Sequence, residues 1–157
     1  MMYLLLKEAL EKAEKDLNVK KMMTEGYFLC SVFASVQNSV NEWILHFYSS
    51  RTNKIVDCSV GESVLLGEET PAEKKFSKLE ADKIKISAEQ ALEKAKKKFK
   101  GSAANTLMTL HKKKGMVWTI NMIAPNMTAT TYNIDAETGK LLSKDTTSLI
   151  TTYSRGS

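Results

Sequence analysis

The stretch Ala9–Ala13 (ALEKA) returns unchanged as Ala91–Ala95, 82 positions later. Two further landmarks repeat in the same order at offsets of 75 and 76: Trp43 with Trp118, and Leu65–Leu66 with Leu141–Leu142. Because the three landmarks keep their order at nearly one spacing, we infer a duplicated unit in which a helix precedes a sheet. The change of offset from 82 to 75 indicates about seven additional residues between the helix and the tryptophan of the first unit.

Both copies of this stretch lie in segments with the periodicity of an amphipathic helix, residues 4–17 and 87–99. Ser87 and Gln90 have the spacing of a capping box, which marks the start of the second helix. The apolar positions match under the offset of 82: Leu6, Leu10, Ala13 and Leu17 correspond to Ala88, Leu92, Ala95 and Phe99. We therefore expect both helices to bury an equivalent stripe against a sheet.

Short segments rich in branched and aromatic residues follow each helix, and short polar turns join them. This pattern favours antiparallel strands. The expected strands are residues 27–36, 42–48, 54–60 and 64–66 in the first unit, and 106–111, 116–124, 128–135 and 140–143 in the second. The turn at 135–139 ends in glycine, which predicts a type I turn closed by a left-handed residue. The run Leu149–Ile150 would add to an edge strand or fray.

The sequence thus predicts an α+β protein of two tandem units, each with one helix packed on a three- to four-stranded antiparallel sheet. The first unit spans residues 1–66 and the second spans residues 84–153. Between them, residues 67–83 form a charged linker in which Pro71 starts a short helix over 72–79. Residues 154–157 have the composition of an expression-tag remnant.

Composition places the chain among ordinary globular proteins: 157 residues, 43% hydrophobic and 26% charged. The apolar run at residues 1–6 is too short for a membrane span, and it lacks the basic flank and cleavage site of a signal peptide. We expect a cytoplasmic protein, or an extracytoplasmic one if a leader has been removed.

The positive charge is concentrated in the second unit. Residues 1–78 hold 10 basic and 11 acidic side chains, for a net charge of −1, whereas residues 79–157 hold 13 and 7, for +6. The candidate binding residues are the densest lysines: Lys96, Lys97, Lys98, Lys100, Lys112, Lys113 and Lys114. They form either a solvated basic face or a patch for phosphates or an acidic protein. With only two arginines, Arg51 and Arg155, sequence-specific nucleic-acid binding is not expected.

The residue types that carry most catalytic and metal chemistry are few. The two cysteines, Cys30 and Cys58, and the two histidines, His46 and His111, all fall in expected strands without a catalytic or zinc-ligand spacing. The cysteines are either reduced core residues or a bridge between neighbouring strands. We expect no catalytic residues, no metal site and no cofactor, and we expect both tryptophans in the core.

Three stretches of the second unit resemble the PepSY family: residues 84–92 (IKISAEQAL), 117–120 (VWTI) and 132–142 (YNIDAETGKLL). The first unit resembles it more weakly, with 42–44 (EWI) and a divergent hairpin at 59–63. The resemblance implies a small α+β module related to cystatin-like shapes. In that family such modules occur in propeptides of secreted metallopeptidases and in cell-envelope proteins, where they bind or inhibit partners.

The function expected from these observations is a non-enzymatic module that binds a protein or peptide through a sheet edge or a sheet face, with an inhibitory or regulatory role toward a peptidase. The alternative is a cytoplasmic protein that binds an anionic polymer or an acidic partner through the lysines of the second unit. A small-molecule pocket between helix and sheet is a third interpretation.

Overall fold

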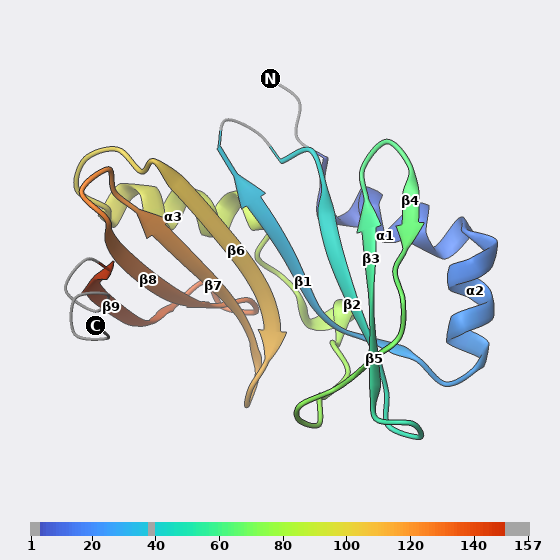
Figure 1. The fold of residues 1–157 in the computed structure, drawn as a ribbon. Coiled ribbons are helices and arrows are strands. Elements are labelled where there is room, and N and C mark those ends of the chain that lie inside the picture. Colours follow the sequence, from blue (N-terminus) through green and yellow to red (C-terminus); the bar gives the residue numbers. More distant parts are fainter. Residues whose placement is uncertain (1–3, 38–39, 150–157) are drawn as a thin grey trace, which may run out of the picture. The chain divides into compact units, whose positions relative to one another are not determined.

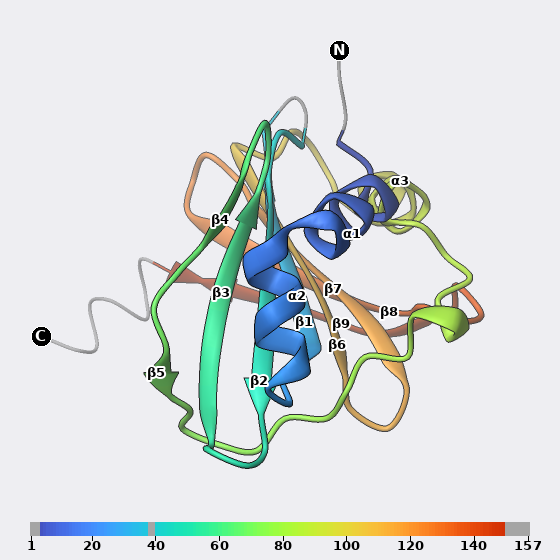
Figure 2. The same ribbon diagram turned by 90° about the vertical axis from the view of Figure 1, so that its right-hand side faces the viewer.

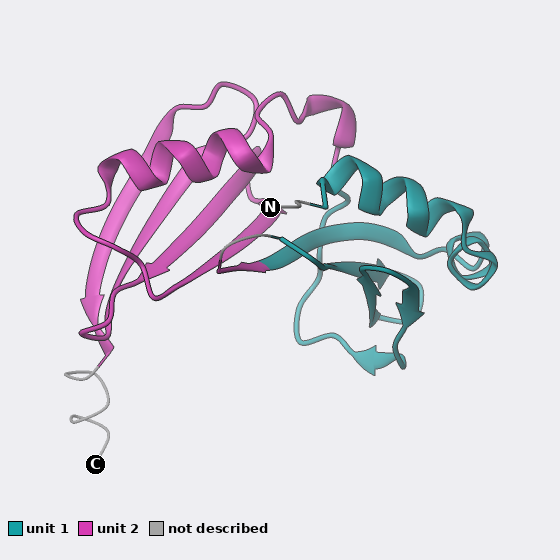
Figure 3. Cartoon of the chain, turned by 90° about the horizontal axis from the view of Figure 1, so that it is seen from above, with its two compact units in different colours: residues 1–34, 38–79 teal, residues 35–37, 80–157 magenta. Residues whose placement is uncertain are grey.

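The chain divides into two units, residues 1–34 with 38–79 and residues 35–37 with 80–157 (Figure 3). The computed structural model describes residues 4–37 and 40–149 (Figure 1). In each unit helices pair with antiparallel strands, which confirms the α+β class. The described residues form these elements: α1 (Leu6–Lys15), α2 (Leu17–Thr24), β1 (Phe28–Val36), β2 (Trp43–Ser49), β3 (Lys54–Val60), β4 (Val64–Leu66), β5 (Thr70–Pro71), the 3₁₀ turn η1 (Ala81–Lys83), α3 (Ala88–Lys98), β6 (Asn105–Lys112), β7 (Met116–Ile123), β8 (Thr128–Asp135) and β9 (Leu141–Ser148).

The first unit orders its strands β4-β3-β2-β1, and β5 forms a short additional pair with β3. Helices α1 and α2 lie against one face of these strands (Figure 2). The side chains that alternate toward this face are buried: Trp43 and Leu45 of β2 are fully inaccessible, as are Cys58 and Val60 of β3. Period-two alternation along the strands therefore directs the core toward the helices.

The helix expected over residues 4–17 is present as α1, but it ends two residues earlier than expected, and a second helix that was not predicted, α2, follows it. Helix α1 ends at Lys15, and the Asp16 carboxylate accepts hydrogen bonds from the backbone N–H groups of Asn18 (2.9 Å) and Val19 (3.0 Å). An aspartate in this role starts a new helix. Leu17 becomes the first residue of α2 and is 78% exposed, although the stripe predicted it to be buried.

The second unit orders its strands β6-β7-β8-β9, and α3 packs on β7. The expected capping box is present at the start of α3: Gln90 donates its N–H to Ser87 Oγ (3.1 Å) and accepts the N–H of Ser87 on Oε1 (2.8 Å). Ala88, Leu92 and Ala95 of the predicted stripe are buried, and Trp118 is fully buried beneath them.

The helix predicted over residues 72–79 is absent from the structure. Thr70 and Pro71 instead pair with β3, and the following residues have no regular secondary structure until η1. Tertiary contacts explain the difference. The ring of Phe76 lies 5.5 Å from that of Tyr48, and the buried Leu79 donates its N–H to the carbonyl of Leu29 at 2.9 Å. These contacts hold the segment against the first unit, and a helix would withdraw both residues from them.

Candidate functional site

Strand β9 is the most accessible run of regular backbone in the second unit. It pairs with β8 on one side, and no other strand of the described residues pairs with it. Six of its eight residues are exposed. An unpaired strand edge offers a row of N–H and C=O groups that an extended peptide can bind.

The alternation of hydrogen-bonded residues along β9 identifies which backbone groups face outward. Leu149 donates its N–H to the carbonyl of Met127 (3.0 Å), and the register pairs Thr147 with Ala129. Because hydrogen-bonded pairs alternate in an antiparallel ladder, the odd-numbered residues bond to β8. The backbone N–H and C=O groups of Lys144 and Thr146 are therefore directed away from the sheet.

The side chains of β9 protect this edge against indiscriminate pairing. Lys144 and Asp145 place opposite charges in the middle of the strand, and Leu142 is its exposed apolar residue, at 51%. Charged side chains on an edge strand disfavour association with arbitrary hydrophobic segments. Among the described residues, no strand pairs with the outer edge of β9, and its exposed side chains are mostly polar.

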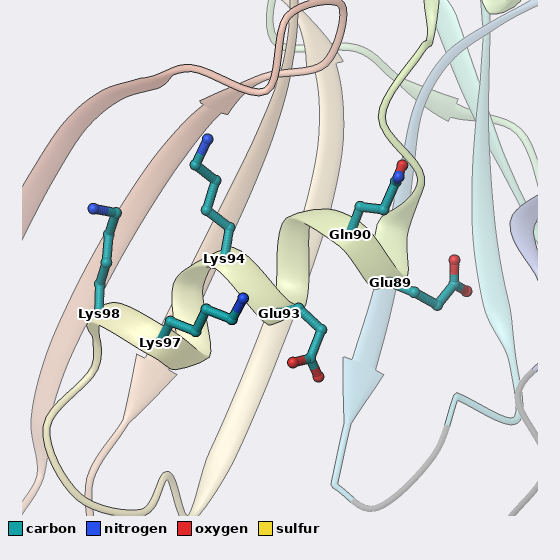
Figure 4. A pocket seen from close by; sticks show the side chains of 6 residues that line it. All are labelled: Glu89, Gln90, Glu93, Lys94, Lys97 and Lys98. Atoms are coloured by element: carbon teal, nitrogen blue, oxygen red, sulfur yellow. The ribbon is translucent and has the colours of Figure 1, made fainter.

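Helix α3 contacts the hairpin formed by β8 and β9. The Lys94 amine donates a hydrogen bond to the carbonyl of Gly139 in the turn that connects β8 to β9. Figure 4 shows a shallow depression along α3, lined by Glu89, Gln90, Glu93, Lys94, Lys97 and Lys98. Gln90, Lys94 and Lys98, which are spaced by four residues, point to one side of the helix, whereas Glu93 and Lys97 point elsewhere (Figure 4).

The predicted lysine cluster lies at two ends of the second unit. Lys96, Lys97, Lys98 and Lys100 are exposed at the C-terminal end of α3, just before β6 begins. Lys112, Lys113 and Lys114 lie after the whole length of β6, in the turn toward β7. Eight residues of strand span about 26 Å, so the two groups do not form one patch.

Residues 85–145 match the family model described as "Peptidase propeptide and YPEB domain", PepSY. Residues 85–145 are a PepSY domain. The resemblance found in the sequence of the second unit is thereby confirmed. No curated protein shows significant sequence similarity to the chain.

A similar solved structure is the crystal structure of "a putative lipoprotein" from Clostridium difficile 630. The two structures superimpose with a TM-score of 0.67 at 14% sequence identity. The superposition covers 94% of this chain and 95% of the lipoprotein chain. At this identity the similarity shows a shared fold that spans both units.

The first unit repeats a contact of the PepSY domain. Lys12 of α1 donates its amine to the carbonyl of Gly61 at 2.9 Å, in the turn between β3 and β4. Lys12 is the counterpart of Lys94 under the offset of 82, and both glycines lie in the turn that joins the third strand of their unit to the fourth. Each unit thus ties its helix to the equivalent turn. In the first unit, however, the strand after the turn has three residues, against eight in β9.

Lys112 forms an ion pair within the second unit. Its amine lies 2.6 Å from one oxygen of Glu80, and Lys83 lies 2.6 Å from the other. Hydrogen bonds from these two amines lower the pKa of Glu80 to about 2. This ion-pair network fastens η1 to the end of β6, so the predicted binding residue Lys112 has a structural role.

The cysteines and histidines do not converge on one site. Cys30 and Cys58 are buried free thiols, and burial raises the pKa of each to about 11. The Cys30 Sγ–H donates to the backbone carbonyl of His46 at 3.3 Å. The His46 ring instead pairs with the Asp57 carboxylate at 2.7 Å. The cysteines are thus reduced core residues, and thiols with such pKa values are poor nucleophiles near neutral pH.

His111 belongs to a polar ladder on the sheet face opposite α3. Its Nε2 lies 2.9 Å from Thr119 Oγ1, which donates to Asn133 Oδ1 at 2.6 Å. Asn133 in turn donates to Ser143 Oγ at 2.8 Å, so the ladder crosses four strands and reaches β9. Within residues 4–37 and 40–149, no three His, Cys, Asp or Glu side chains are grouped to hold a metal ion.

The edge strand is longer than its sequence predicted. A strand was expected over residues 140–143, whereas β9 runs from Leu141 to Ser148. The run Lys144–Ser148 contains two threonines, which favour strands, but its polarity resembles that of a loop. Alternation in hydrophobicity gave no signal, because neither face of the outer half of β9 is buried.

Proposed function

We propose that the PepSY domain binds an extended segment of a partner protein, which adds as a strand to the outer edge of β9. The observation that carries this proposal is the eight-residue strand whose Lys144 and Thr146 backbone groups face outward. Main-chain hydrogen bonds provide affinity in such strand addition, and side chains provide specificity.

The family supports a binding role over a catalytic one. PepSY domains are typically non-catalytic, and their description names peptidase propeptides. We therefore propose a peptidase as the first partner to test, with inhibition or regulation as the consequence of binding. The buried thiols with raised pKa and the separated histidines offer no assembled alternative among the described residues.

We further propose that the protein works outside the cytoplasm. The support is the PepSY description and the shared fold with a protein described as a lipoprotein. In the described residues, no helix combines the length and apolar character that crossing a bilayer requires. Cell fractionation of the native host, with detection by an antibody, tests this: recovery with cytosolic markers would contradict it.

A matched pair of variants at Lys144 tests strand addition. Peptides selected from a displayed random ten-residue library are measured by fluorescence anisotropy against wild type, Lys144→Ala and Lys144→Pro. Both variants lose the amine, and only proline also removes the outward N–H. Proline is tolerated at such edge positions. We expect Lys144→Pro to bind at least about fivefold more weakly than Lys144→Ala.

Equal binding by the two variants would overturn strand addition at β9. Circular dichroism and thermal unfolding establish that Lys144→Pro is folded. A second measurement uses the wild-type protein alone: bound peptide slows hydrogen exchange at the amides of Lys144 and Thr146, whose N–H groups otherwise face solvent. Unchanged exchange at these two amides in the presence of bound peptide would also count against the proposal.

A second candidate function rests on the exposed lysines at the end of α3, Lys96–Lys98 and Lys100. They would bind an anionic polymer without any need for a strand edge. Long-chain polyphosphate is a suitable probe, because such binding weakens steeply between low and physiological salt and is unaffected by Lys144→Pro.

A further inference from the structure

The charges beside β9 differ between the two faces of the sheet. On the face covered by α3, Lys144 places its amine 5.8 Å from the centre of the Tyr132 ring, which is fully buried beneath the helix. On the opposite face, Asp145 is exposed next to Thr131. The side chains of a strand that joins β9 alternate between the two faces of the sheet. They therefore lie alternately on the side of Lys144 and on the side of Asp145.

Helix α3 extends the positive side of this arrangement. Lys94 reaches the β8–β9 turn through its bond to Gly139, and Lys98 follows one turn later and points the same way (Figure 4). The helix carboxylates Glu89 and Glu93 point away from that side (Figure 4). The α3 side of the β9 hairpin thus carries Lys94, Lys98 and Lys144.

We propose that the strand bound by β9 carries acidic side chains on the face that it turns toward α3, and neutral or basic side chains on the face that it shares with Asp145. This inference rests on the proposed function, because it specifies the partner of the same edge. The recognised partner is an extended acidic segment with alternating character. A uniformly acidic segment would place a carboxylate against Asp145, where like charges directly opposed are unfavourable.

The displayed ten-residue library tests this pattern directly. After selection against the wild-type protein, Asp and Glu should be enriched at every second position of the peptide (either the odd or the even ones) and depleted at the positions between. Acidic parity means this alternation. Enrichment without parity would mean attraction by net charge only, and it would overturn the inference. Binders with no acidic enrichment at all would overturn it as well.

Two neighbouring lysines provide a matched control. Lys98→Glu and Lys97→Glu change the net charge equally, but only Lys98 points toward the β9 side of α3. We expect Lys98→Glu to weaken the binding of a selected acidic peptide about two- to fivefold, and Lys97→Glu to leave it nearly unchanged. Equal losses for the two variants would contradict the inference.

The failures of the two proposals can be told apart. If selected peptides lose affinity with Lys144→Pro relative to Lys144→Ala but show no acidic parity, strand addition stands and the acidic pattern falls. If selected peptides are acidic but bind Lys144→Pro and Lys144→Ala equally, strand addition falls and the acidic segment is not bound as a strand, so both proposals fail.

Discussion

The indole Nε1 of Trp118 donates a hydrogen bond to the backbone carbonyl of Ile86 at 2.9 Å, and this contact joins the central strand of the PepSY domain to the entrance of its helix. Trp43 makes the counterpart bond in the first unit, to the carbonyl of Leu4 at 2.8 Å. Leu4 and Ile86 are separated by the helix offset of 82, whereas the tryptophans are separated by 75. The same contact is therefore kept across a change in spacing.

Replacing Trp118 with phenylalanine should destabilise the protein by about 1–3 kcal/mol. The substitution leaves the Ile86 carbonyl without the indole donor and creates a cavity at a fully buried position. Urea unfolding followed by circular dichroism measures the change. Trp43→Phe should cost a similar amount, because its side chain is equally buried and makes the equivalent bond. A loss below about 0.5 kcal/mol in either variant would contradict this structural role.

Gly139 should not tolerate a side chain. Its φ of 80° is in the left-handed region, and an added Cβ would lie 3.2 Å from Ile86 Cδ1. We expect Gly139→Ala to lower the free energy of unfolding by about 1–2 kcal/mol. Gly115→Ala is the control, since an added Cβ there meets nothing within 4 Å and should change stability by less than about 0.5 kcal/mol. Similar losses at both positions would contradict the prediction.

The features that the sequence predicted well are those encoded by neighbouring residues. The stripe of α3 and its capping box depend on residues a few positions apart, and strands β3, β4 and β8 have the predicted bounds. The turn before Gly139 is equally local, because Asp135 Oδ1 accepts the N–H of Glu137 at 2.8 Å.

The features that were missed depend on contacts between distant residues. The segment around Phe76 is not helical because the Phe76 ring packs on Tyr48, 28 positions earlier in the chain. The lysines at 96–100 and 112–114 were grouped because they are close in sequence, but the intervening β6 separates them in space. The break at Asp16 did have a local signal, since aspartate is a preferred N-cap, but the continuous apolar spacing outweighed it in the prediction.

Removing the hydroxyl of Tyr132 should leave stability unchanged or raise it by up to about 1 kcal/mol. This hydroxyl is buried, and it has no hydrogen-bond partner among the described residues. An unsatisfied buried polar group is unfavourable, so Tyr132→Phe removes a cost and keeps the ring. Thermal unfolding measures the effect.

Tyr48→Phe provides the matched comparison for the hydroxyl. The Tyr48 hydroxyl donates to Asn53 Oδ1 at 2.7 Å, so its removal should cost about 1 kcal/mol. A destabilisation by Tyr132→Phe as large as that by Tyr48→Phe would mean that the Tyr132 hydroxyl does have a partner, such as a bound water.

Glu80 should make stability depend on pH in the acid range. Lys112 and Lys83 lower its pKa from 4.5 to about 2, and a group whose pKa is lowered on folding stabilises the protein above its unfolded pKa. This contribution is complete above about pH 5 and is lost as the pH falls toward 2. The urea midpoints of wild type and Glu80→Gln should therefore differ most near pH 6 and converge near pH 2.

The difference at pH 6 should also shrink in high salt, because the network is partly exposed. Lys112→Gln tests the assignment, since in the Glu80→Gln background it should add little to the pH dependence. A difference between wild type and Glu80→Gln that stays constant from pH 6 to pH 2 would show that the ion pairs do not set this dependence.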